Sequence, residues 1–219
     1  MKPTKSAASP GRSAGVPQDV PSPIDFRLRA DAAAWEASAL EKRPVRPQAF
    51  AAFSSALATL DRPAARILEL GSGPGFLVER FLTDFPACTY VALDFSPAMH
   101  ELAAKRLGAR AARVRFVERS FREAGWSSGL GAFDAVVTNQ AVHELRHKRH
   151  ALALHRAVRP LLSPGGVYLV CDHFHGDGGM SDDQLYMSVA EQRARLLEAG
   201  FPSVNLLWQA GGLVLHAAA

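Results

Sequence analysis

The sequence predicts an α/β fold with a doubly wound sheet and helices on both faces. Short β-rich runs alternate with helical runs along most of the 219 residues. The first five β-rich runs are almost continuously apolar, as expected for parallel strands that helices cover on both faces. The last two are separated only by residues 209–212, which predicts an antiparallel hairpin.

The composition is typical of a globular protein with a single core. Apolar residues make up 48% of the chain and charged residues 21%, which argues against global disorder. No apolar stretch is long enough to span a membrane, and the N-terminus lacks the apolar core of a secretory signal. The two cysteines, Cys88 and Cys171, are too few for a disulfide scaffold and indicate buried thiols. We therefore expect a cytoplasmic protein without membrane contact.

The N-terminal quarter is expected to contain a tail and a lid. Residues 1–23 are rich in Pro, Ser, Gly and Ala, which predicts a disordered tail. Residues 24–60 follow a helical pattern, with a second helix beginning at Pro47. One face of this pattern carries Phe26, Leu28, Trp35 and Leu40. We expect residues 24–60 to form a helical lid, with Phe26 and Trp35 as its apolar cover, in front of a domain of residues 61–219.

Seven strands and several well-marked helices follow. The strands are expected over residues 65–70, 89–94, 113–118, 133–139, 166–172, 203–208 and 213–217. Ser96-Pro97 predicts a helix start, and Gly108 can end that helix. An amphipathic helix is expected over residues 146–162. Ser188 and Glu191 form a capping-box pattern for a last helix that Gly200 can end.

The most informative stretch is ILELGSGPGFLVERF, residues 67–81. A buried strand ends at Glu69-Leu70, and three alternating glycines then form a turn into a helix. Glycines at these positions let the backbone bend sharply and let a ligand approach without a Cβ in the way. The turn lies at the carboxyl end of the first strand, where open α/β sheets bind ligands.

The glycine spacing separates two classes of nucleotide-binding protein. Dinucleotide-binding proteins use G-x-G-x-x-G, and here Phe76 stands where the third glycine would fall. The E-x-G-x-G-x-G pattern resembles the first motif of the class I S-adenosylmethionine-dependent methyltransferases. The resemblance covers about residues 47–219. It implies a Rossmann-like seven-stranded sheet of order 3-2-1-4-5-7-6 with strand 7 antiparallel, and methyl transfer from S-adenosyl-L-methionine.

The resemblance also implies the residues that bind the cofactor. The glycine turn would hold its methionine part and ribose through Glu69, Gly71, Ser72, Gly73 and Gly75. Asp94, at the end of the second strand, would accept hydrogen bonds from the ribose hydroxyls. Phe95 and Met99 continue this second motif, with Phe95 beside the adenine.

Two further motifs differ in how well they fit the family. In the third motif, Ser120 stands at the position that is usually an acid, and Phe121 follows it. The resemblance implies that both residues contact the adenine. In the fourth, Asn139 and Gln140 begin a segment that passes under the sulfonium in the family. The sequence there lacks the Asp/Asn-Pro-Pro-aromatic motif of DNA amine methyltransferases. Nucleic acid is therefore not an expected partner.

Two histidines are candidates for the acceptor side. His143 and His173 follow the fourth and fifth strands, so both are expected at the cleft. If the acceptor is a hydroxyl, one of them should act as a base. A neutral histidine packed at the cleft rim remains the alternative, and a nucleophilic acceptor would need only positioning. No cysteine or second carboxylate completes a metal site near His143, so we expect none.

The acceptor is expected to be a small molecule, because 219 residues leave no room for a separate recognition domain. Two other functions remain open: a protein that binds S-adenosylmethionine without turnover, and a nicotinamide-dependent oxidoreductase on a similar sheet. The glycine spacing and the absence of a Tyr-x-x-x-Lys pair argue against the oxidoreductase. The sequence does not indicate the oligomeric state.

Overall fold

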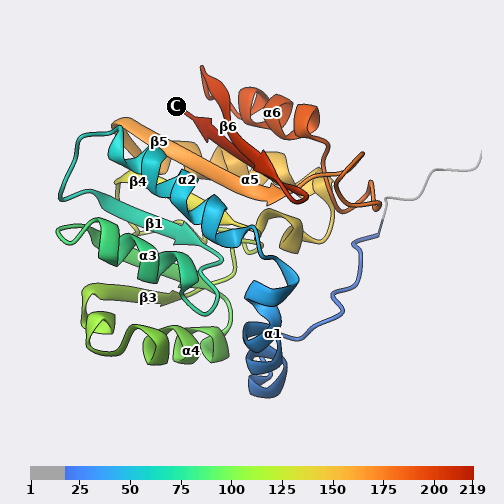
Figure 1. Cartoon of the computed structure of the whole chain (residues 1–219). Coiled ribbons are helices and arrows are strands. Elements are labelled where there is room, and N and C mark those ends of the chain that lie inside the picture. The colour runs from blue at the N-terminus through green and yellow to red at the C-terminus, as the bar shows by residue number, and fades with distance from the viewer. Residues whose placement is uncertain (1–17) are drawn as a thin grey trace, which may run out of the picture.

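A seven-stranded sheet lies between two layers of helices in the computed structural model, which describes residues 18–219 (Figure 1). The strand order is β3-β2-β1-β4-β5-β7-β6. Strands β1 to β5 pair in parallel, and β7 pairs antiparallel with both β5 and β6. The predicted α/β class and strand order are therefore confirmed.

The elements follow the predicted alternation closely. The strands are β1 Arg66–Leu70, β2 Thr89–Asp94, β3 Val114–Glu118, β4 Phe133–Asn139, β5 Leu162–His173, β6 Val204–Ala210 and β7 Leu213–Ala218. The α-helices are α1 Arg29–Lys42, α2 Arg46–Ala58, α3 Phe76–Asp84, α4 Pro97–Leu107, α5 Ala151–Val158 and α6 Val189–Glu198. Short 3-10 turns are η1 Gly108–Arg113, η2 Val142–Leu145, η3 Lys148–His150 and η4 Arg159–Leu161.

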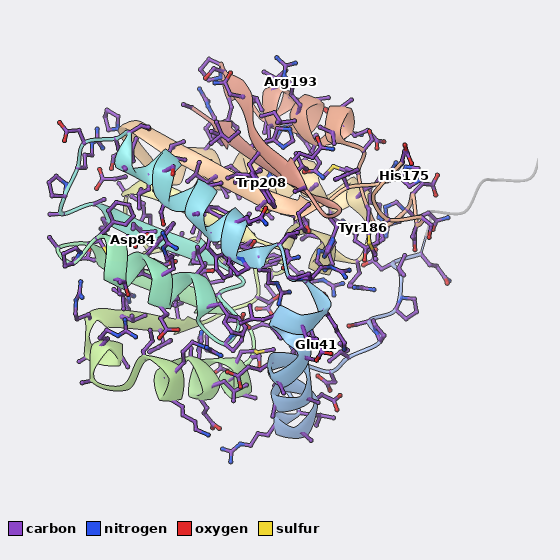
Figure 2. The ribbon with its side chains drawn as sticks, in the orientation of Figure 1. Glu41, Asp84, His175, Tyr186, Arg193 and Trp208 are labelled. Atoms are coloured by element: carbon purple, nitrogen blue, oxygen red, sulfur yellow. The ribbon has the colours of Figure 1, made fainter. Side chains whose placement is uncertain are left out.

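The sheet is apolar on both faces because both are covered. Alternate residues along a strand face opposite layers. Ile67 and Leu169 pack with α2 and α3, whereas Leu68 and Tyr168 pack with α5 and α6. Trp208 of β6 packs on the α2 side (Figure 2). The carboxyl ends of β1, β2, β4 and β5 consequently meet along one edge, where polar side chains can be held.

Helix ends agree with the cap signals in the sequence. The Ser96 hydroxyl accepts from the Met99 amide at the start of α4. Ser188 and Glu191 form the predicted capping box of α6. The helix expected over residues 146–162 is shorter, because Arg146 takes a left-handed φ of 65° and ends η2. Only residues 151–158 are α-helical, between two 3-10 turns.

The expected lid divides into two parts. Trp35 of α1 and Phe26, which precedes the helix, pack against α4, but Leu28 and Leu40 are exposed. Helix α2 is part of the core rather than of a lid over the cavity, because Phe50 and other apolar side chains of α2 pack against α3. The lid role can therefore apply only to the segment before α2.

The chain before α1 differs from the predicted tail. Residues 1–17 of that tail lie outside the described residues. The next residues bind the domain: the Arg146 guanidinium donates to the carbonyls of Val20 and Pro21, and the Val20 amide donates to the Arg146 carbonyl. Asp19 pairs with Arg122 at 3.1 Å. These contacts join segments more than 100 residues apart in sequence, which local composition does not reveal.

Two observations concern the environment of the protein. Both Cys88 and Cys171 are buried free thiols, as the sequence predicts. Within residues 18–219, the helices are all too short or too polar to cross a membrane.

His216 of β7 provides a test of the core. Its side chain is fully buried, neither ring nitrogen has a partner among residues 18–219, and burial lowers its pKa to about 4. We expect His216→Leu to raise the free energy of unfolding by about 1 kcal/mol or more at neutral pH, because an unpartnered polar group leaves the core. Chemical denaturation measures this, with the half-exposed His175→Leu as control.

The same variant should change the response to acid. The unfolded chain takes up this proton near pH 6.5 and the folded chain only near pH 4, so stability falls as the pH decreases between these values. His216→Leu should reduce that fall. An unchanged or steeper acid dependence in the variant would contradict the assignment of His216 as a buried neutral group.

Candidate functional site

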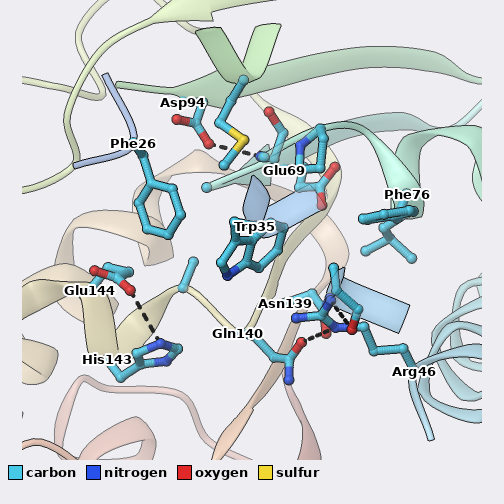
Figure 3. Close-up of a pocket in the computed structure, with 18 of the residues that line it drawn as sticks. Phe26, Trp35, Arg46, Glu69, Phe76, Asp94, Asn139, Gln140, His143 and Glu144 are labelled. Carbon is cyan, nitrogen blue, oxygen red and sulfur yellow. Dashed lines mark hydrogen bonds and ion pairs between the residues drawn. The ribbon is translucent and has the colours of Figure 1, made fainter. Parts of the chain in front are cut away.

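A cavity lies at the carboxyl ends of the central strands, under α1 (Figure 3). It brings together most of the residues expected in the site: Glu69, Gly71, Ser72, Gly73, Asp94, Phe95, Met99, Phe121, Asn139, Gln140, His143 and His173. Phe26 and Trp35 of the N-terminal segment also line it. The carboxyl-edge position of the site is the one that parallel α/β sheets favour.

The three glycines of the β1–α3 turn have different roles. All three have positive φ, between 53° and 81°. A Cβ on Gly71 would lie 2.5 Å from the Ala141 Cβ, and one on Gly75 would lie 3.0 Å from the Ala103 Cβ. A Cβ on Gly73 would meet nothing within 4 Å, and this residue lines the cavity. Gly73 therefore leaves backbone open to a ligand, whereas Gly71 and Gly75 are required for packing.

Gly75 and Ser120 are the two expected residues that do not line the cavity. Gly75 caps α3 and faces α4, so its packing role explains why it recurs in the motif. Ser120 lines a neighbouring hollow between residues 22–27 and 120–123. Phe121 lines both spaces, which makes it the member of the third motif that reaches the main cavity.

Asp94 joins the glycine turn to the end of β2. Its Oδ2 accepts from the Gly73 amide at 2.8 Å and its Oδ1 from the Ser96 amide at 2.9 Å. The side chain is only 6% exposed. Burial raises the pKa of Asp94 to about 6, against the effect of the backbone hydrogen bonds. The carboxyl group is therefore ionised at neutral pH, with remaining acceptor capacity toward the cavity.

Glu69 is held in a different state. It is buried in the floor of the cavity and accepts a hydrogen bond of 2.8 Å from the Tyr90 hydroxyl. Burial raises the pKa of Glu69 to about 8, and the nearby Asp94 charge adds to the effect. Its carboxyl group is therefore mostly protonated at neutral pH, and it can donate as well as accept a hydrogen bond.

Sequence reasoning missed a buried arginine on the opposite wall. Arg46, at the start of α2, is only 6% exposed and donates to the Gln140 Oε1 at 2.5 Å and to the Ala39 carbonyl at 2.9 Å. Its guanidinium lies over the Trp35 ring, 4.9 Å from the centroid. Burial lowers the pKa of Arg46 to about 10, which leaves it charged. Its position next to Pro47 in a helix start carried no local signal of function.

His143 is part of a charged cluster with two carboxylates. Its Nδ1 lies 2.7 Å from the Asp172 Oδ1, and its Nε2 lies 3.4 Å from the Glu144 Oε1. Burial alone would lower the pKa of His143, but the charges and hydrogen bonds of Asp172 and Glu144 outweigh it and raise the pKa to about 10. The ring is therefore an imidazolium at neutral pH, with a proton on each nitrogen. This charge state differs from that of the base its sequence position suggested.

His173 is neutral and also engaged. Burial lowers its pKa to about 4. The Gln140 amide nitrogen lies 3.3 Å from the His173 Nε2, and the Arg46 bond to the Gln140 oxygen fixes this orientation. The His173 Nδ1 is buried without a partner among residues 18–219, and it carries the ring proton when Nε2 accepts from Gln140. The ring packs 5.2 Å from that of His143 and 5.7 Å from that of Tyr186, which lies in the loop after β5 (Figure 2). Neither histidine thus offers an unengaged basic nitrogen to the cavity.

The other histidines and acids do not form a metal centre. In residues 18–219, no three His, Cys, Asp or Glu side chains are placed to hold a metal ion together. His147 instead caps η3 by accepting from the Arg149 amide. His150 lies 2.8 Å from Asp19 of the N-terminal segment.

Parts of the chain are similar to known methyltransferases. Residues 68–168 match a family model described as a methyltransferase domain. The chain is 32% identical over 89 residues to a malonyl-[acyl-carrier protein] O-methyltransferase of Paenibacillus sp. (strain JDR-2), covering 40% of this chain and 32% of that protein. It is 32% identical over 114 residues to the demethylmenaquinone methyltransferase of Thermus thermophilus, covering 52% and 49%. The chain thus matches half or less of the length of these relatives.

A solved structure shares the fold over a longer range. The DhpI–SAH complex has a TM-score of 0.68 at 23% identity, covering 87% of this chain and 92% of that one. The matched domain over residues 68–168 and the shared strand order therefore show a methyltransferase domain model and a methyltransferase-like fold in this chain.

The charged cluster yields a prediction about His143. Asp172→Asn should lower the pKa of His143 by several units, because burial then outweighs the remaining Glu144 interaction. Glu144→Gln is the matched control and should lower it less, since Glu144 lies farther from the ring. Titration of the ring by NMR measures both. A larger effect of Glu144→Gln would contradict the assigned partner.

The free energy of unfolding of the wild type and that of Asp172→Asn should also depend differently on pH. The folded pKa of about 10 lies above the ordinary 6.5, so this group stabilises the fold fully below pH 6.5 and loses that effect as the pH rises through 10. Asp172→Asn should reduce this alkaline loss.

Proposed function

We propose that the protein transfers a methyl group from S-adenosyl-L-methionine to a small acceptor molecule. The observation that carries this proposal is the open backbone of Gly73, tied to the buried Asp94 at the cavity wall. A cofactor with a ribose and an amino-acid tail fits such a turn, because it needs close backbone approach and a carboxylate acceptor. When bound, the cofactor supplies a methyl group activated on a sulfonium.

The chain offers groups for each part of this cofactor. Asp94 would accept from the ribose hydroxyls, with Phe95, Met99 and Phe121 around the adenine. Arg46 is a buried cation on the opposite wall and would pair with the carboxylate of the methionine part. The Asn139 Oδ1 and Ser72 Oγ have no partner within the described chain, which fits a ligand that supplies donors such as an ammonium group.

The remaining cavity residues would hold the acceptor and exclude water. Phe26 and Trp35 cover the cavity with apolar surface. His143 and His173 lie beyond Gln140, over the ends of β4 and β5, and would position the acceptor. In-line methyl transfer depends mainly on such positioning.

The comparisons support the reaction class rather than a particular acceptor. The two relatives are named for different acceptors, a carrier-protein-bound malonyl group and a demethylmenaquinone. The glycine spacing and the matched domain give no support to the nicotinamide-dependent alternative. We also propose that the protein acts in the cytoplasm, since its two cysteines are buried free thiols.

Calorimetry with S-adenosylmethionine tests the proposal. We expect binding by the full-length protein and none of NADPH. Asp94→Asn should weaken binding about 10- to 150-fold, because a charged acceptor of the ribose hydroxyls is lost. Asp177→Asn, an exposed acid outside the cavity, is the control and should bind normally. No binding by the wild-type protein would overturn the proposal.

A pair of glycine variants separates binding from folding. Gly73→Ala should weaken cofactor binding more than it lowers stability, since the added Cβ meets only the open cavity and its φ of 53° costs about 1 kcal/mol. Gly71→Ala should lower the melting temperature more, because its Cβ overlaps Ala141. Melting curves and calorimetry on both variants check this. Equal loss of stability in the two would contradict the distinct roles.

A further inference from the structure

The acceptor half of the cavity has a surplus of positive charge. Lys42 and Arg43, at the end of α1, line the cavity beside Arg46. Neither Lys42 nor Arg43 forms an ion pair within the described part of the chain. Arg46 binds only neutral groups, the Gln140 side chain and the Ala39 carbonyl, as Figure 3 shows for Gln140. Apart from Arg46, Lys42 and Arg43 thus line one region with no carboxylate partner among residues 18–219.

The acids of the cavity are bound elsewhere and do not balance these cations. Asp94 accepts from two backbone amides on the far side, at β2. Glu69 is paired with Tyr90 and mostly protonated at neutral pH. Glu144 lies 3.4 Å from both His143 and Arg146. The one carboxylate of the proposed cofactor would balance only Arg46, which leaves the charges of Lys42 and Arg43 unbalanced.

Lys42 and Arg43 line the cavity next to Arg46, which is linked to the ends of β4 and β5. Arg46 reaches Gln140 at the end of β4, and Gln140 in turn contacts His173 at the end of β5. After burial, the charges of His143, Arg43 and Arg46 contribute to the low pKa of His173. The glycine turn and Asp94 lie at the ends of β1 and β2.

In the described part of the chain, neither histidine of the acceptor side is set to accept a proton. Both nitrogens of His143 are directed to carboxylates, and the His173 Nε2 is engaged by Gln140. An alcohol acceptor would need a base to remove its proton during transfer. An oxygen that is already ionised at neutral pH would not.

We propose that the acceptor is a small oxyanion, a carboxylate or a phosphonate-type group, which Lys42 and Arg43 bind and whose own charged oxygen receives the methyl group. This proposal rests on the proposed methyl transfer. The acceptor oxygen contributes a lone pair to the new O–C bond, the S–C bond breaks, and its electron pair stays on sulfur. The sulfonium becomes a neutral thioether, the oxyanion loses one negative charge as it becomes an ester, and no proton moves.

The two kinds of cation suit this task. An oxyanion has at least two oxygens, so the cations can hold one while another attacks. The planar guanidinium of Arg43 matches a carboxylate or phosphonate, and Lys42 adds a mobile point charge at the exposed rim. A positive rim also attracts anions from solution, which makes binding sensitive to salt.

Binding of simple anions to the full-length protein tests this proposal independently of turnover. The protein is saturated with S-adenosylhomocysteine, and short- and medium-chain carboxylates, alkylphosphonates and the matching primary amides are titrated by calorimetry. We expect one or both anion series to bind and the amides not to bind. The two anion series distinguish a carboxylate site from a phosphonate site. High salt should weaken the binding.

Charge variants complete the test. The double variant Lys42→Gln and Arg43→Gln should weaken anion binding about tenfold or more while S-adenosylhomocysteine binds as before. Lys105→Gln with Arg156→Gln removes the same charge at exposed positions outside the cavity and should change neither. Normal cofactor binding with no anion binding, or with equal binding of the amides, would overturn this proposal and leave the proposed function standing. Loss of cofactor binding in the wild type would instead refute the proposed function.

Finally, labelled S-adenosylmethionine with the bound anions should yield the methyl esters. The double variant should raise the KM for the anion more than it lowers kcat. Methylation of alcohols or amines in place of the anions would overturn the proposal.

Discussion

The bond between the Gly73 amide and the Asp94 carboxylate is the contact on which the site depends. It joins the turn after β1 to the end of β2, and through Ser96 it also fixes the start of α4. The same carboxylate therefore sets the path of two loops that pass on either side of the cavity. Its burial is what makes the charge available to a ligand, because few other groups or waters compete for its remaining lone pairs.

Much of this arrangement could be predicted from local patterns. The apolar runs of β1 to β5 have no polar face, so they indicated buried parallel strands and hence a carboxyl edge where a site could form. The alternating glycines identified the turn, and the Ser96 and Ser188 caps placed two helix starts correctly. The strand order itself came from the family resemblance, since periodicity does not specify which strands are neighbours.

The features that could not be predicted all depend on contacts between distant segments. In the sequence, Arg46 is an ordinary residue before a helical proline. Its place in the cavity wall becomes evident only from its contact with Gln140 in the folded chain. The charge of His143 depends on Asp172, 29 residues away, and on whether Glu144 turns toward the ring. Leu28 and Leu40 fit an apolar stripe, yet α1 packs mainly on α4 and leaves these two side chains exposed to water. The residue type determines which protonation states a side chain can have, but its partners in the fold determine which state it adopts at neutral pH.

The attachment of the N-terminal segment has a consequence for how the cavity is covered. Arg146 binds Val20 and Pro21 before α1, and α2 is anchored in the core after it. Helix α1 is thus fixed at both ends by contacts that belong to the chain itself. The loss of conformational entropy needed to order this cover is then a cost of folding rather than of association. A ligand that enters beneath it meets walls that are already in place, and any opening is a swing about two fixed points rather than a detachment.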